Sequence, residues 1–125
     1  MRKALLSGIL LTTLVGCGIL PSKWDDNESW AVINLYTDIS LIDCYGQPHE
    51  IKSDVRQVRH SLDWFRHYTT YNNTADIDEL LDIMDETVSG IEVRDSWSIT
   101  YCKLKQDNLL SQAKSVSKAV MGRSK

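Results

Sequence analysis

The chain has 125 residues, 42% of them hydrophobic, and its 17 acidic and 14 basic side chains give a net charge of −3. This length suits one small domain and excludes two. The negative charge argues against bulk binding to nucleic acid, because phosphate backbones require a basic surface.

A secretory signal peptide is predicted for residues 1–16. Arg2 and Lys3 give a positively charged start, and residues 4–15 form an apolar run, which is the order of regions in such signals. The run is shorter than the roughly 20 residues that a membrane-spanning helix needs. We therefore expect export and cleavage instead of a transmembrane anchor, which lowers the net charge from −3 to −5 by removing Arg2 and Lys3.

The signal ends in Leu14-Val15-Gly16-Cys17, which resembles the lipobox of bacterial lipoproteins. The resemblance implies that the Cys17 thiol receives a diacylglycerol, that cleavage follows Gly16, and that the new amine is acylated. Several acyl chains anchor a protein stably. Gly18, where an Asp would resemble an inner-membrane retention signal, implies the outer membrane, and residues 17–26 become the lipidated cysteine and a short tether. The alternative is an ordinary secretory signal that contains a cysteine.

The two remaining cysteines are Cys44 and Cys102, an even pair in a chain that we expect to enter an oxidising compartment. We predict a disulfide between them, which closes a loop of about 59 residues and is worth about 4 kcal/mol in the chain-entropy model. Two buried free thiols are the alternative. The absence of a Cys-x-x-Cys motif argues against a thiol–disulfide catalyst.

Residues 27–125 are predicted to form one helical domain, and its first helix covers roughly 27–44. Asn27 or Ser29 is the expected cap, and the apolar stripe is Val32, Leu35, Tyr36, Ile39 and Ile42. Residues 45–48 then form a turn. The second helix has the clearest pattern, because apolar positions recur at spacings of four and three. These positions are Ile51, Val55, Val58, Leu62, Phe65 and Thr69.

Residues 71–74 end the second helix, and Asn73 or Thr74 is expected to cap a third helix that stops at Gly90. Its stripe is Ile77, Leu80, Leu81, Met84, Val88 and Ile91. A fourth helix is expected to start near Asp95 or Ser96 and to bury Cys102, Leu109, Ala113, Val116 and Val120. However, Trp97, Ile99 and Tyr101 alternate as in a strand. The prediction is an all-α, four-helix fold with one disulfide, and the alternative is an α+β fold with a short hairpin.

Charged side chains form two blocks. Residues 76–95 hold eight acids against one base, and residues 103–125 hold six bases against one acid. We expect complementary faces on neighbouring elements; the alternative is a basic tail that contacts anionic lipid or an acidic partner.

No phosphate loop, Gly-x-Ser-x-Gly or His-Glu-x-x-His motif occurs in the sequence. The best metal candidates are His60, Asp63 and His67, which share the polar face of the second helix. His60 and His67 lie about 10 Å apart along the helix axis, too far for one tetrahedral metal. We expect a protein that is not an enzyme and that holds neither a metal nor a cofactor.

Aromatic residues point instead to protein binding. Trp64 and Tyr71 fall on the outer face of the second helix beside Arg56, and Trp, Tyr and Arg are the residues enriched at binding hot spots. Trp97 and Tyr101 are the second candidate site. Coverage of Trp64 by a neighbouring helix is the alternative, and Trp24 and Trp30 are expected at the membrane interface.

The predicted architecture as a whole resembles the pilotins of type II secretion. The features that carry the resemblance are the lipobox at Leu14–Cys17, about 110 mature residues, four short helices, and the cysteine pair Cys44 and Cys102 that joins the first helix to the fourth. The resemblance implies that the domain faces the periplasm and binds the disordered C-terminal segment of a secretin, which folds to a helix in an apolar groove. The lipid then directs the secretin to the outer membrane. The alternative is a phage- or plasmid-encoded envelope lipoprotein that acts in lysis or in superinfection or entry exclusion.

Overall fold

The computed structural model describes residues 23–123, which form a four-helix bundle with no strand. The helices are α1 (Asp26–Ser40), α2 (Pro48–Asn72), α3 (Asp78–Glu92) and α4 (Ile99–Met121), and a 3₁₀ turn, η1 (Ala75–Ile77), precedes α3. The all-α, four-helix prediction is confirmed, and the described residues contain no hairpin. None of the helices within 23–123 combines the length and the hydropathy needed to cross a bilayer.

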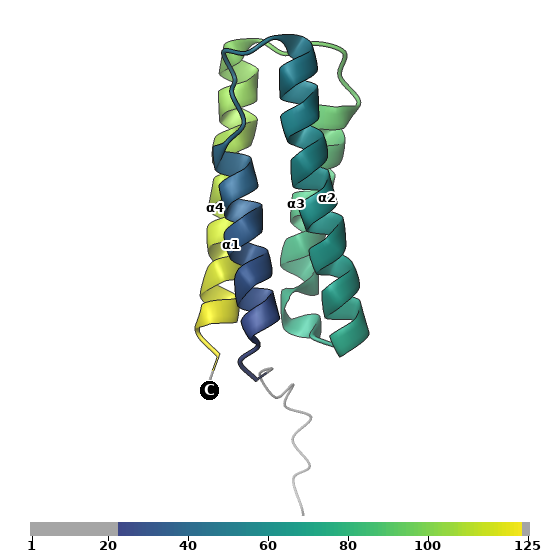
Figure 1. Cartoon of the computed structure of the whole chain (residues 1–125), viewed down its shortest axis with the longest axis vertical. Coiled ribbons are helices and arrows are strands. Elements are labelled where there is room, and N and C mark those ends of the chain that lie inside the picture. The colour runs from purple at the N-terminus through teal and green to yellow at the C-terminus, as the bar shows by residue number, and fades with distance from the viewer. Residues whose placement is uncertain (1–22, 124–125) are drawn as a thin grey trace, which may run out of the picture.

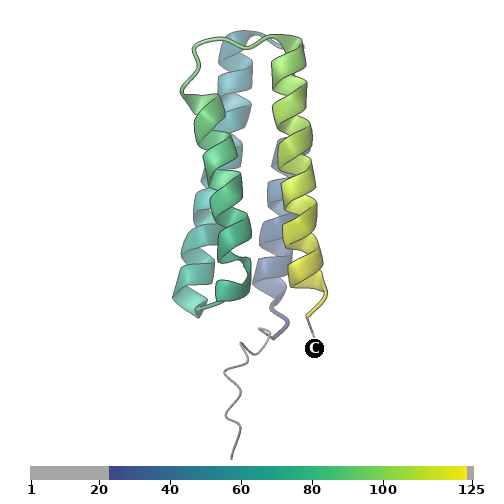
Figure 2. The same ribbon diagram turned by 180° about the vertical axis from the view of Figure 1, so that it is seen from behind.

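The helices run up and down beside one another (Figure 1). α1 packs against α2 and α4, and α3 packs against the same two helices, so the bundle is square in section. Figure 2 shows α3 and α4 side by side on the opposite face from α1 and α2. The α1–α2 and α3–α4 connections share one end of the bundle, and the start of α1, the α2–α3 connection and the end of α4 share the other.

The core follows the predicted stripes closely. All six predicted core positions of α2 are buried, and Val58, Leu62 and Phe65 are completely so. The predicted positions of α3 and α4 are buried as well, except for Leu80, which is half-buried at the edge of the core. Amphipathic periodicity is a strong signal here because each helix has neighbours on two sides and solvent on the rest.

The first helix differs from its prediction at both ends. Asp25, and not Asn27 or Ser29, is the cap, since its carboxylate accepts hydrogen bonds from the main-chain N–H groups of Asn27 and Glu28. The helix ends at Ser40, so Cys44 lies in the connection beyond it. Ile42 and Cys44 remain buried there because the connection folds over the end of the core. Tyr36 is 46% exposed and does not belong to the core stripe.

The later boundaries also need correction. Asn73 adopts the left-handed conformation (φ 55°) and ends α2 instead of capping the next helix. Gly90 does not stop α3, which continues to Glu92. Ser98 caps α4 through a hydrogen bond from the N–H of Tyr101. The alternating stretch is therefore part loop, with Trp97, and part first helical turn, with Ile99 and Tyr101.

The end of the bundle that holds the α1–α2 connection is tied covalently. Cys44 and Cys102 form the predicted disulfide, with their Cα atoms 5.6 Å apart. Beside it, the side-chain amide of Gln106 donates hydrogen bonds to the carbonyl oxygens of Ile39 and Ile42, each at 2.9 Å. α4 therefore holds the last turn of α1 and the chain that follows it.

The opposite end is tied by buried charges. Arg123, which follows α4, forms ion pairs with Glu28 of α1 and with Asp76 of η1. Glu28 is completely buried, and its other carboxylate oxygen accepts a hydrogen bond of 2.7 Å from the Thr74 hydroxyl. This network joins the start of α1 to the α2–α3 connection and to the end of α4.

Candidate interaction groove between α1 and α2

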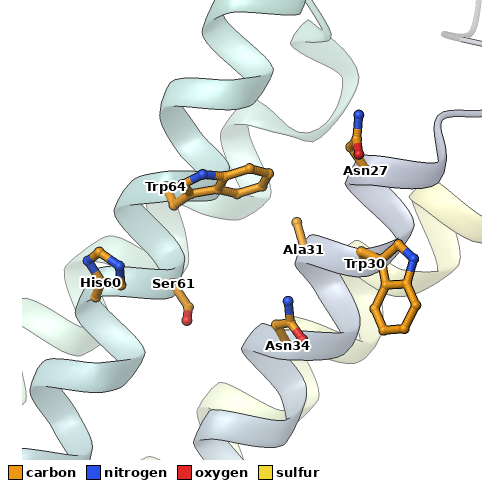
Figure 3. Close-up of a pocket in the computed structure, with 7 residues that line it drawn as sticks. All are labelled: Asn27, Trp30, Ala31, Asn34, His60, Ser61 and Trp64. Atoms are coloured by element: carbon orange, nitrogen blue, oxygen red, sulfur yellow. The ribbon is translucent and has the colours of Figure 1, made fainter.

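A groove of about 340 Å³ runs between α1 and α2, at the part of the bundle that carries the first predicted binding residue, Trp64. We call it the Trp64 groove; its lining residues are Asn27, Trp30, Ala31, Asn34, His60, Ser61 and Trp64. Figure 3 shows the Trp64 indole projecting from α2 toward α1, where the small side chain of Ala31 lies opposite. Trp30 and His60 lie at the two outer edges, and Asn34 and Ser61 face each other further along.

The Trp64 side chain is half-exposed and held in place. Its ring stacks on that of Tyr68, with centroids 5.2 Å apart and planes 12° from parallel. The Tyr68 hydroxyl donates to the Asp25 carboxylate at 2.8 Å and accepts from the Asn27 amide at 3.0 Å. Tyr68 thus connects Trp64 to the capped start of α1. An exposed aromatic ring held by a second ring is a preorganised contact surface.

The outer face of α1 adds apolar surface beside the groove. Trp30 is 64% exposed, and Ile33 and Tyr36 are exposed on the same helix. The sequence had suggested the membrane interface for Trp30, and its place on the groove edge was not predicted. The available signal was the spacing of Asn27, Ala31 and Asn34, which places short side chains on one side of α1 at intervals of four and three.

The other flank of α2 is closed by charge pairs. Arg59 bonds to Glu92, Asp85, Asp63 and the Ser89 hydroxyl, and Arg66 pairs with Asp82 and Asp85 at 2.6 and 3.0 Å. The hydrogen bonds to Glu92, followed by those to Asp85, raise the pKa of Arg59. The hydrogen bond from Arg59 holds the pKa of Asp85 below its ordinary value.

These ion pairs involve several carboxylates of the acidic block at residues 76–95. Its carboxylates pair mainly with Arg59 and Arg66 of α2, and the buried Arg123–Asp76 pair links the acidic block to the basic block. The expectation that the acidic and basic blocks face each other is therefore wrong for α3, whose carboxylates pair with arginines of α2, and it holds for the Arg123–Asp76 pair.

The other predicted binding residues lie elsewhere. Arg56 lines a hollow of about 260 Å³ with Lys52, Val55, Glu92 and Trp97, which we call the Trp97 hollow. Tyr71, 89% exposed, lies near the end of α2 beside Arg66 and His67. The five predicted residues thus do not form one site.

Trp97 and Tyr101 take part in internal contacts. The Trp97 indole donates to the carbonyl oxygen of Ile91 at 3.3 Å, and its ring packs against the core. The Tyr101 hydroxyl contacts the carbonyl oxygen of Gly90 at 3.4 Å, and the Arg94 guanidinium lies 3.9 Å above its ring. These contacts help to close the end of the bundle near the disulfide.

Within residues 23–123, no group of three or more His, Cys, Asp or Glu side chains is placed to hold a metal ion. His67 Nδ1 lies 2.6 Å from the main-chain oxygen of Asp63, so one of its ring nitrogens is engaged by its own helix. The predicted signal peptide, the predicted lipidation site Cys17 and most of the predicted tether lie outside the described residues.

Comparison of the chain with protein-family models, with curated proteins and with solved structures found no match.

Proposed function

We propose that this protein is an outer-membrane lipoprotein that acts as a non-catalytic binding module, and specifically as a pilotin that binds a secretin C-terminal segment. The observation that carries the proposal is the Trp64 groove, where two partly exposed indoles border a cleft between antiparallel helices whose lining contains no Asp, Glu, Lys or Arg. Large aromatic side chains at a cleft provide the anchors on which binding energy concentrates.

The shape of the groove favours a helical segment. Its walls are two helices, and its lining alternates indole and methyl surface with the amides of Asn27 and Asn34 and the hydroxyl of Ser61. An amphipathic helix can place apolar side chains at i, i+3, i+4 and i+7 along such a cleft. The polar groups then bond to side chains at the edge of the bound helix.

The walls are rigidly placed. α1 is held near its start by the ion pair of Glu28 with Arg123 and near its end by Gln106 and the disulfide. Because α1 cannot easily move away from the bundle, little ordering is needed when a partner binds. A disordered partner must already lose conformational entropy on folding, so a fixed groove favours the complex.

The predicted anchor suits this arrangement. Cys17 precedes Trp24 by seven residues, which span at most about 25 Å when extended. Lipidation at Cys17 would therefore hold the start of α1 and the adjacent groove close to the membrane, where the C-terminal segment of an outer-membrane protein can reach them.

Titration with the C-terminal peptides of secretins from the same cell tests this proposal. Tryptophan fluorescence should report binding with a Kd below about 100 μM, and Trp64→Ala should weaken it by about 2–4 kcal/mol. Leu104→Ala is the matched control, because Leu104 is equally exposed but lies on α4. If none of the peptides binds, the pilotin proposal fails. If Leu104→Ala weakens binding as much as Trp64→Ala, the groove is not the site.

Labelling with palmitate tests the anchor independently. The wild-type chain should incorporate the label and sediment with outer membranes, and Cys17→Ser should do neither. Equal labelling of the two chains would contradict the lipoprotein assignment without affecting the groove.

A further inference from the structure

The segment that builds α1 carries no basic side chain of its own. Residues 24–51 contain six acids (Asp25, Asp26, Glu28, Asp38, Asp43 and Glu50) and no Lys or Arg. This segment includes the whole of α1 and the connection to α2, so one wall of the Trp64 groove is built from a helix without a cationic side chain.

Three of these carboxylates lie beside residues of the groove lining, although none of them lines the groove itself. The Asp38 carboxylate accepts a hydrogen bond from the hydroxyl of Ser61, which lines the groove. The Asp25 carboxylate accepts from Tyr68, whose ring stacks on Trp64. Asp26, four residues before Trp30, is exposed and accepts from the Trp24 indole at 2.7 Å. The groove therefore has acidic groups toward both of its ends.

The α2 wall supplies no Lys or Arg to the groove lining. Arg59 and Arg66 point to the other flank of α2, where carboxylates of α3 engage them. Arg56 lines the Trp97 hollow. His60 is the titratable side chain of the groove lining. The exposed lysines of α4 lie on a helix that packs on α1 and α3, whereas the groove lies between α1 and α2.

We infer that the Trp64 groove takes a basic amphipathic helix, with Lys or Arg beside the apolar residues that contact Trp64 and Trp30. Cations at the edges of such a helix meet Asp38 at one end of the groove and Asp26 near the other. Complementary charge of this kind accelerates encounter and selects among partners more than it adds affinity. An acidic segment with the same apolar face meets like charge along α1. This inference rests on the proposed function and defines the class of partner.

Two synthetic peptides with one apolar face test the charge requirement. Both carry the same Leu and Trp residues at helical spacing, and one has Lys and the other Glu at every flanking position. Fluorescence titration of the full mature chain in detergent at low salt should give a Kd at least tenfold lower for the Lys peptide. The ratio should shrink as salt is raised, because the charges at the edge of the groove are exposed.

Substitutions in the chain separate groove charge from overall charge. Asp26→Asn combined with Asp38→Asn should reduce the preference for the Lys peptide at least threefold, and both changes keep an oxygen that accepts the existing hydrogen bond. Asp107→Asn removes a charge from the exposed face of α4 and should leave the preference unchanged.

Two results overturn the inference: equal binding of the two peptides, or an effect of Asp107→Asn as large as that of the combined Asp26→Asn and Asp38→Asn variant. In either case, loss of binding in Trp64→Ala would still support the groove as a protein-binding site, and the proposed function would stand. If Trp64→Ala weakens the binding of neither peptide, the proposed site and the inference both fail.

Discussion

The two ends of the bundle are closed by different chemistry. The end near the α1–α2 connection has the Cys44–Cys102 disulfide and the hydrogen bonds of Gln106 to main-chain carbonyl oxygens. The end at which α1 begins has the buried Glu28–Arg123–Asp76 network. One closure depends on oxidation, whereas the other depends on a charge balance that holds only while every partner is present.

Together, the two closures explain why a groove can stay open between α1 and α2. Because α1 is held near both of its ends, the seam between α1 and α2 does not need to be sealed by long side chains. Asn27, Ala31 and Asn34 face Ser61 and Trp64 there, and the groove remains. On the other flank of α2, arginines and carboxylates fill the equivalent seam with α3.

The largest expected loss of stability follows removal of Arg123. Arg123→Met leaves the completely buried Glu28 without its cation, which should lower the free energy of unfolding by about 3–5 kcal/mol. Urea denaturation measures the loss. Adding Glu28→Gln to Arg123→Met should restore part of the stability, since the uncompensated charge disappears. A double variant that is less stable than Arg123→Met would contradict a paired charge at this end.

Loss of the disulfide should have the next largest effect. Replacing Cys44 and Cys102 together by Ala should lower the free energy of unfolding by about 2–5 kcal/mol, the usual cost for a small exported domain. Reduction of the wild type should give a similar loss, and the double variant should not respond to reductant. Two alkylatable thiols in the oxidised wild-type domain would show that the bond does not form.

The ion pairs between α2 and α3 should make a smaller, pH-dependent contribution to the free energy of unfolding. Arg59 lowers the pKa of Asp85 in the folded state, so this contribution is present above the ordinary Asp pKa and is lost as the pH falls through the lower folded value. Asp85→Asn should cost about 0.5–1 kcal/mol at pH 7, because the pair is partly exposed.

The wild type and Asp85→Asn should become equally stable once the pH lies below the lowered pKa of Asp85 in the folded state. Urea denaturation across this pH range measures the difference, and Asp107→Asn on α4 serves as the control. A difference between wild type and Asp85→Asn that does not change with pH would contradict the ion pair.

The last expected effect is an increase in stability on replacing Gly90. A Cβ added at Gly90 meets nothing within 4 Å, so Gly90→Ala should stabilise α3 by about 0.5–1 kcal/mol. Gly46→Ala is the contrasting variant, since its Cβ would lie 2.9 Å from Glu50 Oε2 and 3.1 Å from the carbonyl oxygen of Asp43. Thermal unfolding should show a higher Tm for the first variant and a lower Tm for the second.

Periodicity predicted most of the fold. The α2 stripe from Ile51 to Thr69 was correct at every position because the whole helix faces one core. It failed at Tyr36, which lies one residue beyond the buried Leu35 on a helix with a narrow buried face. Ile42 is buried as predicted, but it lies in the connection after α1 and not on the helix. Gly90 misled the prediction because helix propensity is a weak signal inside a packed element.

The candidate site was predicted only in part. Trp64 was expected on the outer face of α2, and it is half-exposed there. Its partnership with Trp30 was not foreseen, because the pattern of one helix does not show which neighbour it meets or at what rotation. Arg56 was expected beside Trp64 on the outer face of the second helix, but the rotation of α2 places it beside Trp97.

Chemical-shift mapping of a bound peptide tests the central claim most directly. The indole N–H signals of the four tryptophans can be assigned by substitution, and the mature domain can be titrated with a secretin C-terminal peptide. The account predicts the largest changes at Trp64 and Trp30, with changes in the side-chain amides of Asn27 and Asn34 and little change at Trp97. Changes centred on Trp97, or spread evenly over all four helices, would contradict binding in the Trp64 groove.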